Sequence, residues 1–189
     1  FVEPLPKRWP KANEIGRVWG RLVGNSEAAG SCYQPLAPGV ELVSPRLLPD
    51  TGRIAQYINR RYFVPGISRH ILDIDGVAEE PLIVINNLPT SASLALMRAL
   101  EPDAAFYHCV NDWTHDPYLN GHYEAELAGA ADMVWADSGL NYRRTSSMND
   151  NVIHLSKGVD SELFARARKE PSPPPQQPLC AYFGSIRGN

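Results

Sequence analysis

The stretch that decides the fold is Pro81-Leu-Ile-Val-Ile-Asn-Asn87, a short and continuous apolar run that ends in two asparagines. The run is rich in β-branched residues, which favour strands over helices. An apolar run without polar alternation is typical of a strand that is buried on both faces of a parallel sheet. We therefore expect a buried parallel strand at this position.

Helices and strands alternate downstream of this run. The spacing of apolar residues predicts a helix that begins near Thr90 or Ser91 and ends near Leu100, followed by helices at about 123–131 and 140–148. Strands are predicted between them at 105–109, 133–136 and 152–155. This alternation implies βαβ crossovers and a doubly wound sheet. The expected fold class is α/β, a Rossmann-like parallel sheet flanked by helices.

The pattern upstream of residue 81 is less regular. The alternation of Val40, Leu42 and Ser44 predicts a strand that ends before Pro45. Residues 53–63 and 68–72 have helical spacing, but Pro65-Gly66 lies between them. Because this dipeptide is a strong turn signal, the sequence predicts two short helices here.

A proline-rich segment indicates a domain boundary near the carboxyl end. Residues 169–178 contain five prolines in ten residues, and such a segment cannot supply the amide donors of a helix interior or a central strand. We expect residues 1–168 to form one Rossmann-like domain, 169–178 a stiff linker and 179–189 the start of a second domain. Phe1 is expected to be an internal start, so that the first strand and its glycine-rich loop would precede it.

Composition and missing motifs exclude several classes of protein. The formal net charge of −3 provides no basic field for binding nucleic acid. Three widely spaced cysteines form no C-x-x-C pair, which argues against a disulfide framework or a zinc ribbon and favours a reducing cytoplasm. The sequence also lacks the G-x-G-x-x-G, G-x-x-x-x-G-K-[ST] and G-x-S-x-G motifs of dinucleotide oxidoreductases, P-loop kinases and α/β-hydrolases.

Polar residues follow the carboxyl ends of the predicted strands, where open α/β sheets bind ligands. The richest group lies in residues 106–117, where a carboxylate and two imidazoles stand beside an aromatic ring. Carbohydrate sites need this mixture, because hydroxyl groups require hydrogen bonds and sugar C–H faces stack on aromatic rings. The candidates for contacting such a ligand are Asn86, Asn111, Trp113, His115 and Ser138.

Asp112 and His108 are the candidates for catalysis. Asp112 can act as a general base toward an acceptor hydroxyl, and His108 can donate or accept a hydrogen bond near neutral pH. The structural alternative is that Asp112 caps a turn and that His108 is a partly buried residue with its hydrogen bonds satisfied. His108, His115 and His122 recur every seven residues, but the turns between them exclude one regular helix and the spacing fits no zinc pattern, so no metal is expected.

The amino-terminal residues combine basic and aromatic side chains: Lys7, Arg8, Trp9, Lys11, Arg17, Trp19 and Arg21. Such a face can rest on an anionic membrane and meet a lipid-linked acceptor. The alternative is that the apolar stripe from Ile15 to Leu22 packs on the core and the basic residues are merely solvated. We expect a cytoplasmic location, at the inner face of the membrane if this peripheral contact exists.

A family resemblance is carried by residues 107–186. The chain contains Glu124-x-x-Leu127-x-x-x-Ala131-Asp132-x-Val134-x-x-x-Ser138-x-Leu140, then Asn151-Val152 and Gly158-Val159-Asp160-x-x-x-Phe164. This pattern resembles that of GT-B glycosyltransferases of the family-4 type. Tyr107-His-Cys-Val-Asn-Asp-Trp113 and Tyr182-Phe-Gly-Ser-Ile186 are similar to the teichuronic-acid-type bacterial members. Lys157 departs from the family, which usually has Asn before the glycine.

The resemblance implies two facing Rossmann-like domains, of which the amino-terminal one binds a glycan or lipid-linked acceptor and the other binds a nucleotide sugar. It implies no cofactor and no obligatory metal, and it places Gly184 and Arg187 near the donor diphosphate. If the anomeric configuration is retained, the leaving phosphate can assist the acceptor and Asp112 need only orient it; if it is inverted, Asp112 is the expected base. The alternatives are a nucleotide-sugar epimerase of the same fold and a non-catalytic module that binds a glycan or another partner.

Overall fold

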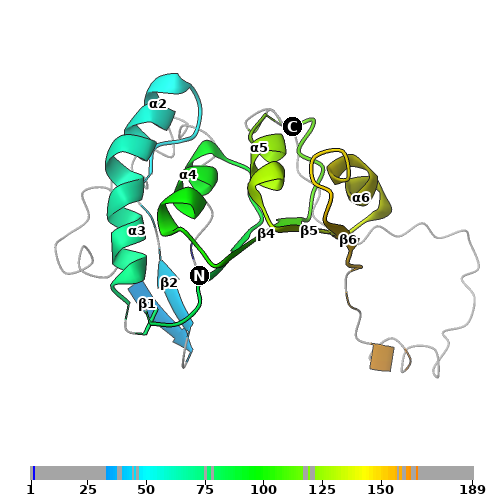
Figure 1. The fold of residues 1–189 in the computed structure, drawn as a ribbon, viewed down its shortest axis with the longest axis horizontal. Coiled ribbons are helices and arrows are strands. Elements are labelled where there is room, and N and C mark those ends of the chain that lie inside the picture. Colours follow the sequence, from blue (N-terminus) through cyan, green and yellow to red (C-terminus); the bar gives the residue numbers. More distant parts are fainter. Residues whose placement is uncertain are drawn as a thin grey trace, which may run out of the picture. The chain divides into compact units, whose positions relative to one another are not determined.

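The computed structural model describes residues 2, 33–37, 40–43, 45, 47–74, 76–77, 79–116, 119, 122–156, 158, 161–162 and 165. The chain separates into two compact units, Phe1–Ser156 and Lys157–Asn189. The labelled helices and strands all lie in the first unit (Figure 1). The predicted linker at 169–178 and the predicted start of a second domain at 179–189 lie outside the described residues.

Four parallel strands form the central sheet, in the order β3-β4-β5-β6. Their bounds are Ile83–Asn86, Ala104–Cys109, Met133–Ala136 and Val152–His154. They are connected by α4 (Ser91–Leu100), α5 (His122–Ala130) and α6 (Gly139–Thr145). Thr90 caps α4 by accepting a hydrogen bond from the Ser93 amide at 3.0 Å. The α/β class and the Rossmann-like parallel sheet predicted from the sequence are confirmed.

The three connecting helices cover one face of this sheet (Figure 1). The strands lie in the sheet in the same order as in the sequence, so each new strand is added at the same edge. Because βαβ crossovers are right-handed, all the connecting helices then lie on the same face of the sheet. On the other face, Ile83 is 58% exposed and Ile85 is 54% exposed. The prediction that this strand is buried on both faces is therefore wrong, and the described strands form only a singly wound sheet in place of the expected doubly wound one.

The hydrophobic core lies between the sheet and the helices that cover it. Its fully buried members include Tyr107 and Cys109 from β4, Leu127 from α5 and Val134 from β5. Leu94 and Met97 of α4 pack against the same cluster. Because the register pairs Tyr107 with Val134, side chains from neighbouring strands meet in one layer under the helices.

A small second sheet lies upstream. In it, β1 (Tyr33–Ala37) pairs antiparallel with β2 (Val40–Val43), and Val2 forms a parallel bridge to Val43. The predicted strand at 40–44 is confirmed as β2. The sequence did not predict β1, because Pro35 inside it is unfavourable in a strand and is tolerated at an edge.

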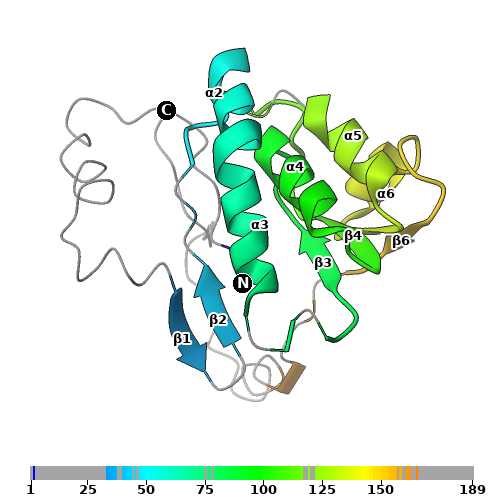
Figure 2. The same ribbon diagram turned by 60° about the vertical axis from the view of Figure 1, so that its left-hand side comes forward.

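One helical run joins the two sheets, through α2 (Arg53–Ile58), the π-helical turn η2 (Asn59–Phe63) and α3 (Val64–Leu72). The predicted break at Pro65-Gly66 is wrong. Pro65 stands at the start of α3, where a missing backbone N–H is tolerated. The π-helical turn places Asn59 in the interior, where its amide makes two hydrogen bonds of 2.9 Å with the backbone of Leu48. Figure 2 shows this run beside α4, against which it packs.

Candidate functional site

The loops that follow the parallel strands gather at the carboxyl-terminal edge of the sheet. The loop after β4 and the loop after β5 are joined there, since the Asp137 amide donates to the Cys109 carbonyl at 3.3 Å. Asn141 of α6 reinforces this contact by donating to the same carbonyl at 3.3 Å and to the Asp137 carboxylate at 3.1 Å. The predicted group of polar residues therefore lies at the edge where α/β sheets bind ligands.

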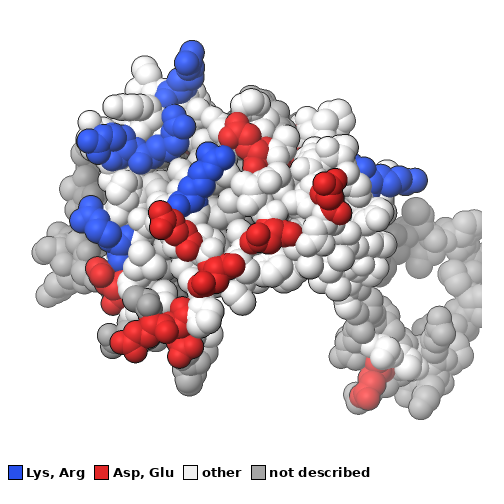
Figure 3. Space-filling view, viewed as in Figure 1, with Lys and Arg blue, Asp and Glu red and all other residues white. Residues whose placement is uncertain are grey.

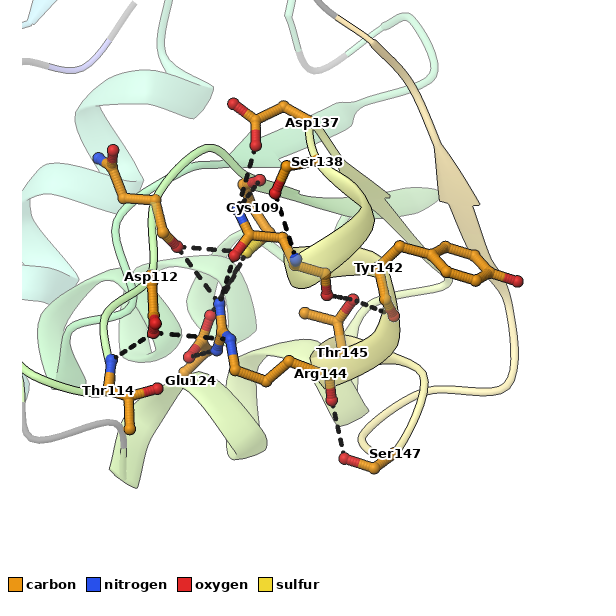
Figure 4. Close-up of polar contacts among 12 residues, drawn as sticks. Cys109, Asp112, Thr114, Glu124, Asp137, Ser138, Tyr142, Arg144, Thr145 and Ser147 are labelled. Atoms are coloured by element: carbon orange, nitrogen blue, oxygen red, sulfur yellow. Dashed lines mark hydrogen bonds and ion pairs between the residues drawn. The ribbon is translucent and has the colours of Figure 1, made fainter.

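Arg144 of α6 connects these loops to the helices (Figure 4). One of its terminal nitrogens, Nη2, lies 3.2 Å from the Cys109 sulfur, 3.3 Å from the Asn111 carbonyl and 3.1 Å from the Asn141 side-chain oxygen. The other, Nη1, donates to the Glu124 carboxylate of α5. A single guanidinium thus fixes the position of the loop that carries Asn111 relative to two helices.

Glu124 lies in the interior, with a side chain that is only 1% exposed. One carboxylate oxygen accepts a hydrogen bond from the Tyr107 hydroxyl at 2.7 Å, and the other pairs with Arg144. A buried charge without a partner is strongly destabilising. The ion pair with Arg144 therefore allows the Glu124 carboxylate to be buried. The pair and the Tyr107 hydroxyl form one connected polar network under the loop.

The protonation states of this network follow from burial and pairing. Burial raises the pKa of the Tyr107 phenol above its ordinary range and raises that of the Cys109 thiol to about 11. Burial acts to lower the pKa of Arg144, but its hydrogen bond to Glu124 and the charge of that residue raise the pKa overall. Near neutral pH the thiol is therefore protonated and unsuited to act as a nucleophile, while the guanidinium remains charged.

Asp112 stands in the loop directly above this network. Its Oδ1 accepts a hydrogen bond from the Thr114 amide at 3.0 Å and lies 3.7 Å from Nε of Arg144. The side chain is 58% exposed, so the carboxylate remains open to solvent and to ligands. Hydrogen bonds from the Thr114 side chain and backbone lower the pKa of Asp112, and the charges of Arg144 and His115 lower it further. A carboxylate of low pKa is a weak general base but a good hydrogen-bond acceptor.

His108 lies on the other side of the sheet. Because strand residues alternate between faces, it points away from the helix-covered face that holds its neighbour Cys109. Its ring is 6.1 Å from that of Trp135 in an edge-on arrangement, and Trp135 also stacks on Phe106 at 4.9 Å. Within the described part of the chain, the contacts join Asp112 to Arg144 and leave His108 in this aromatic group.

The other residues that were predicted to contact a ligand differ in their exposure to solvent. Asn111 and His115 are exposed in the loop, whereas the Trp113 side chain is buried, with 6% exposure. The Ser138 hydroxyl caps α6 by accepting from the Asn141 amide at 3.2 Å. Gly184 and Arg187, the predicted donor-phosphate residues, lie outside the described residues.

Asn86 closes β3 at the same carboxyl-terminal edge. Its side-chain nitrogen Nδ2 is buried and has no hydrogen-bond partner within the described part of the chain. An unsatisfied buried donor of this kind is destabilising by about 1–3 kcal/mol, so such groups are usually met by water or by a ligand. Asn86 therefore remains a candidate for ligand binding at this edge.

The opposite edge of the sheet has a different character. A cavity of about 360 Å³ lies there, lined by Gly129 at the end of α5 and by residues 147–151 before β6. It contains none of the predicted site residues. In the described ranges, no cluster of His, Cys, Asp and Glu has the arrangement of a metal site, and no helix is long and apolar enough to cross a membrane.

Neither Arg144 nor the side chain of Glu124 was predicted from the sequence to have a role in the site. A signal was present, because Glu124 stands in helical register with the buried residues Leu127, Ala128 and Ala131. A carboxylate in such an apolar stripe predicts a buried partner, but its identity depends on how α5 and α6 pack.

Comparison with protein families, curated proteins and solved structures found no match to this chain. What is shown is therefore the parallel α/β architecture and the geometry of its carboxyl-terminal edge.

Proposed function

We propose that this chain is the acceptor-side domain of a glycosyltransferase that moves a sugar from a nucleotide-sugar donor to a glycan or lipid-linked acceptor. The observation that carries the proposal is the Asn111–Asp112 loop, which Arg144 fixes at the carboxyl-terminal edge of a parallel sheet. The loop presents an exposed carboxylate of low pKa in a fixed position. The resemblance of residues 107–164 to family-4 GT-B enzymes supports the same function.

The chemistry assigned to Asp112 is orientation of the acceptor. Its carboxylate accepts a hydrogen bond from an acceptor hydroxyl and aligns that oxygen toward the anomeric carbon of the donor. Because its pKa is lowered, it removes a proton poorly. This suits transfer with retention, in which the leaving phosphate of the donor takes the acceptor proton. Positioning of this kind lowers the barrier because the reacting groups are already aligned.

Other residues of the edge extend the acceptor site. The exposed Asn111 and His115 supply further hydrogen bonds. Asn86 at the end of β3 is assigned to the same acceptor site; its buried Nδ2 has no hydrogen-bond partner among the described residues. Donor binding is assigned to a second α/β domain that includes Gly184 and Arg187. We place the enzyme in the cytoplasm, where nucleotide sugars are made, and propose that it needs neither a metal nor a cofactor.

The test uses the protein that contains this chain together with its donor domain. Nucleotide sugars are supplied with and without saccharide acceptors, and nucleotide release and product mass are measured. We expect release to depend on the acceptor, and Asp112→Ala to lower kcat/KM by about tenfold or more, with a fall in kcat as well as a rise in the KM for acceptor. Asp150→Ala is the matched control, because Asp150 is an exposed carboxylate at the opposite edge of the sheet.

Each alternative gives a distinct result. Conversion of the donor sugar to an isomer without any acceptor would identify an epimerase. Saccharide binding without nucleotide release would identify a non-catalytic module. Equal kcat/KM for the Asp112→Ala and Asp150→Ala variants would remove the assignment of the acceptor site to the Asn111–Asp112 loop.

A further inference from the structure

The helical run Arg53–Leu72 has an unusual charge for this protein. It contains four arginines, at positions 53, 60, 61 and 69, and neither aspartate nor glutamate, although the whole chain has a net charge of −3. In Figure 3, basic side chains lie along the surface of α2 and α3. Within the described part of the chain, no ion pair engages any of the four.

The same run exposes apolar side chains. Ile54 is 79% exposed, Tyr57 is 55% exposed and Tyr62 is 63% exposed. The core-facing side of the run is formed by other residues, namely Ala55, Asn59, Val64 and Ser68. The exposed isoleucine and tyrosines therefore contribute little to the core, and large apolar groups on an outer surface often mark a binding surface.

Basic and apolar groups share the outer side of this run. Arg53, Tyr57 and Arg61 follow one another at intervals of four residues, and all three are exposed, so they lie along one side. Ile54 and Tyr62, which directly follow Arg53 and Arg61 in the sequence, lie beside this line and are also exposed. The guanidinium of Arg61 is 5.6 Å from the centre of the Tyr62 ring, which holds a cation beside an aromatic ring. We call the surface of these five residues the outer face of α2–η2.

We propose that the outer face of α2–η2 binds the surface of a membrane that contains anionic phospholipids. Arginines attract the headgroup phosphates, and tyrosines and an isoleucine beside them enter the boundary between headgroups and acyl chains. Nucleic acid would use the arginines but would leave the exposed Ile54 without a role. Membrane binding by this surface does not depend on sugar transfer. The basic and aromatic amino-terminal stretch from Lys7 to Arg21 lies outside the described residues.

The test is flotation of the purified 189-residue chain with phospholipid vesicles. We expect binding to phosphatidylcholine vesicles that contain phosphatidylglycerol at roughly a third of the lipid, and little binding to pure phosphatidylcholine. Binding should weaken as salt is raised, because the Debye length falls from about 10 Å at 0.1 M to about 3 Å at 1 M.

Two double variants divide the surface into its charged and apolar parts. Arg53→Gln/Arg61→Gln should lower the partition coefficient about 30-fold, since each arginine near an anionic surface contributes roughly a factor of five. Ile54→Ser/Tyr62→Ser should keep the dependence on anionic lipid but abolish the binding that remains at high salt. Arg143→Gln, which changes an exposed arginine of α6, should bind like the unchanged chain. Circular dichroism confirms that each variant is folded.

Three outcomes would overturn the proposal. Equal binding to neutral and anionic vesicles would exclude recognition of lipid charge. If the Arg53→Gln/Arg61→Gln variant binds vesicles as well as the unchanged chain does, another part of the chain makes the membrane contact. Binding to a DNA or RNA duplex in the absence of any binding to anionic vesicles would show that the basic surface serves nucleic acid.

Discussion

Arg144→Met is expected to lower the free energy of unfolding by about 3–5 kcal/mol at neutral pH, because it leaves the buried Glu124 carboxylate without its counter-charge. Met fills most of the volume of the arginine stem, so the loss of packing is small. For a chain of this length, the change corresponds to a fall in melting temperature of roughly 10 °C. Chemical denaturation followed by circular dichroism measures it.

Two further variants show whether the charge pair is the cause. Arg143→Met changes the neighbouring exposed arginine and should alter stability by less than about 0.5 kcal/mol. Glu124→Gln/Arg144→Met removes both charges and keeps a side-chain oxygen for the Tyr107 hydroxyl, so it should recover most of the lost stability. If the double variant is no more stable than Arg144→Met, the buried charge is not what Arg144 compensates.

Leu127→Ala is expected to destabilise the protein by about 2–5 kcal/mol. Leu127 is fully buried at the centre of the core, between the sheet and α5, and its truncation leaves a cavity that the surrounding side chains fill only in part. Leu140→Ala is the matched control, since Leu140 is 74% exposed on α6. Denaturation midpoints should differ clearly between the two variants; similar midpoints would mean that the described core does not hold the unit together.

The strands were the most predictable part of the fold. Ile83–Asn86, Met133–Ala136 and Val152–His154 are short runs with a clear apolar character, and helical spacing is found at 91–100, 123–131 and 140–148. Burial was less predictable, because an apolar run does not say how many faces are covered. That depends on the order of strands, and a sheet that grows in one direction places its helices on one face.

Two local features misled the prediction upstream of the sheet. Pro65 was interpreted as a helix breaker, although a proline at the start of a helical segment lacks only a donor that is not needed there. The π-helical turn before it has no reliable sequence signal, and it makes the run Arg53–Leu72 continuous. Pro35 is the reason why β1 was not predicted, because proline is excluded from central strands but is tolerated in edge strands.

The location of Asp112 in the fold could be predicted from the sequence, but the contacts around it could not. The position of Asp112 after a parallel strand was sufficient to place it at the carboxyl-terminal edge, and its hydrogen bond from Thr114 is the turn contact that the sequence offered as an alternative. The sequence gives no direct sign that Arg144 lies under this loop. That contact joins residues more than thirty positions apart and depends on the packing of α6 against β5 and β6.

Mapping of saccharide binding on the chain by NMR tests the central claim most directly. Amide signals are followed while acceptor saccharides are titrated into the 189-residue chain and into its Asp112→Ala variant. We predict shifts at Asn86, Asn111, Asp112 and Ser138, and their loss in the variant. Shifts confined to Gly129 and residues 147–151, at the opposite edge, would contradict the placement of the acceptor site in the Asn111–Asp112 loop.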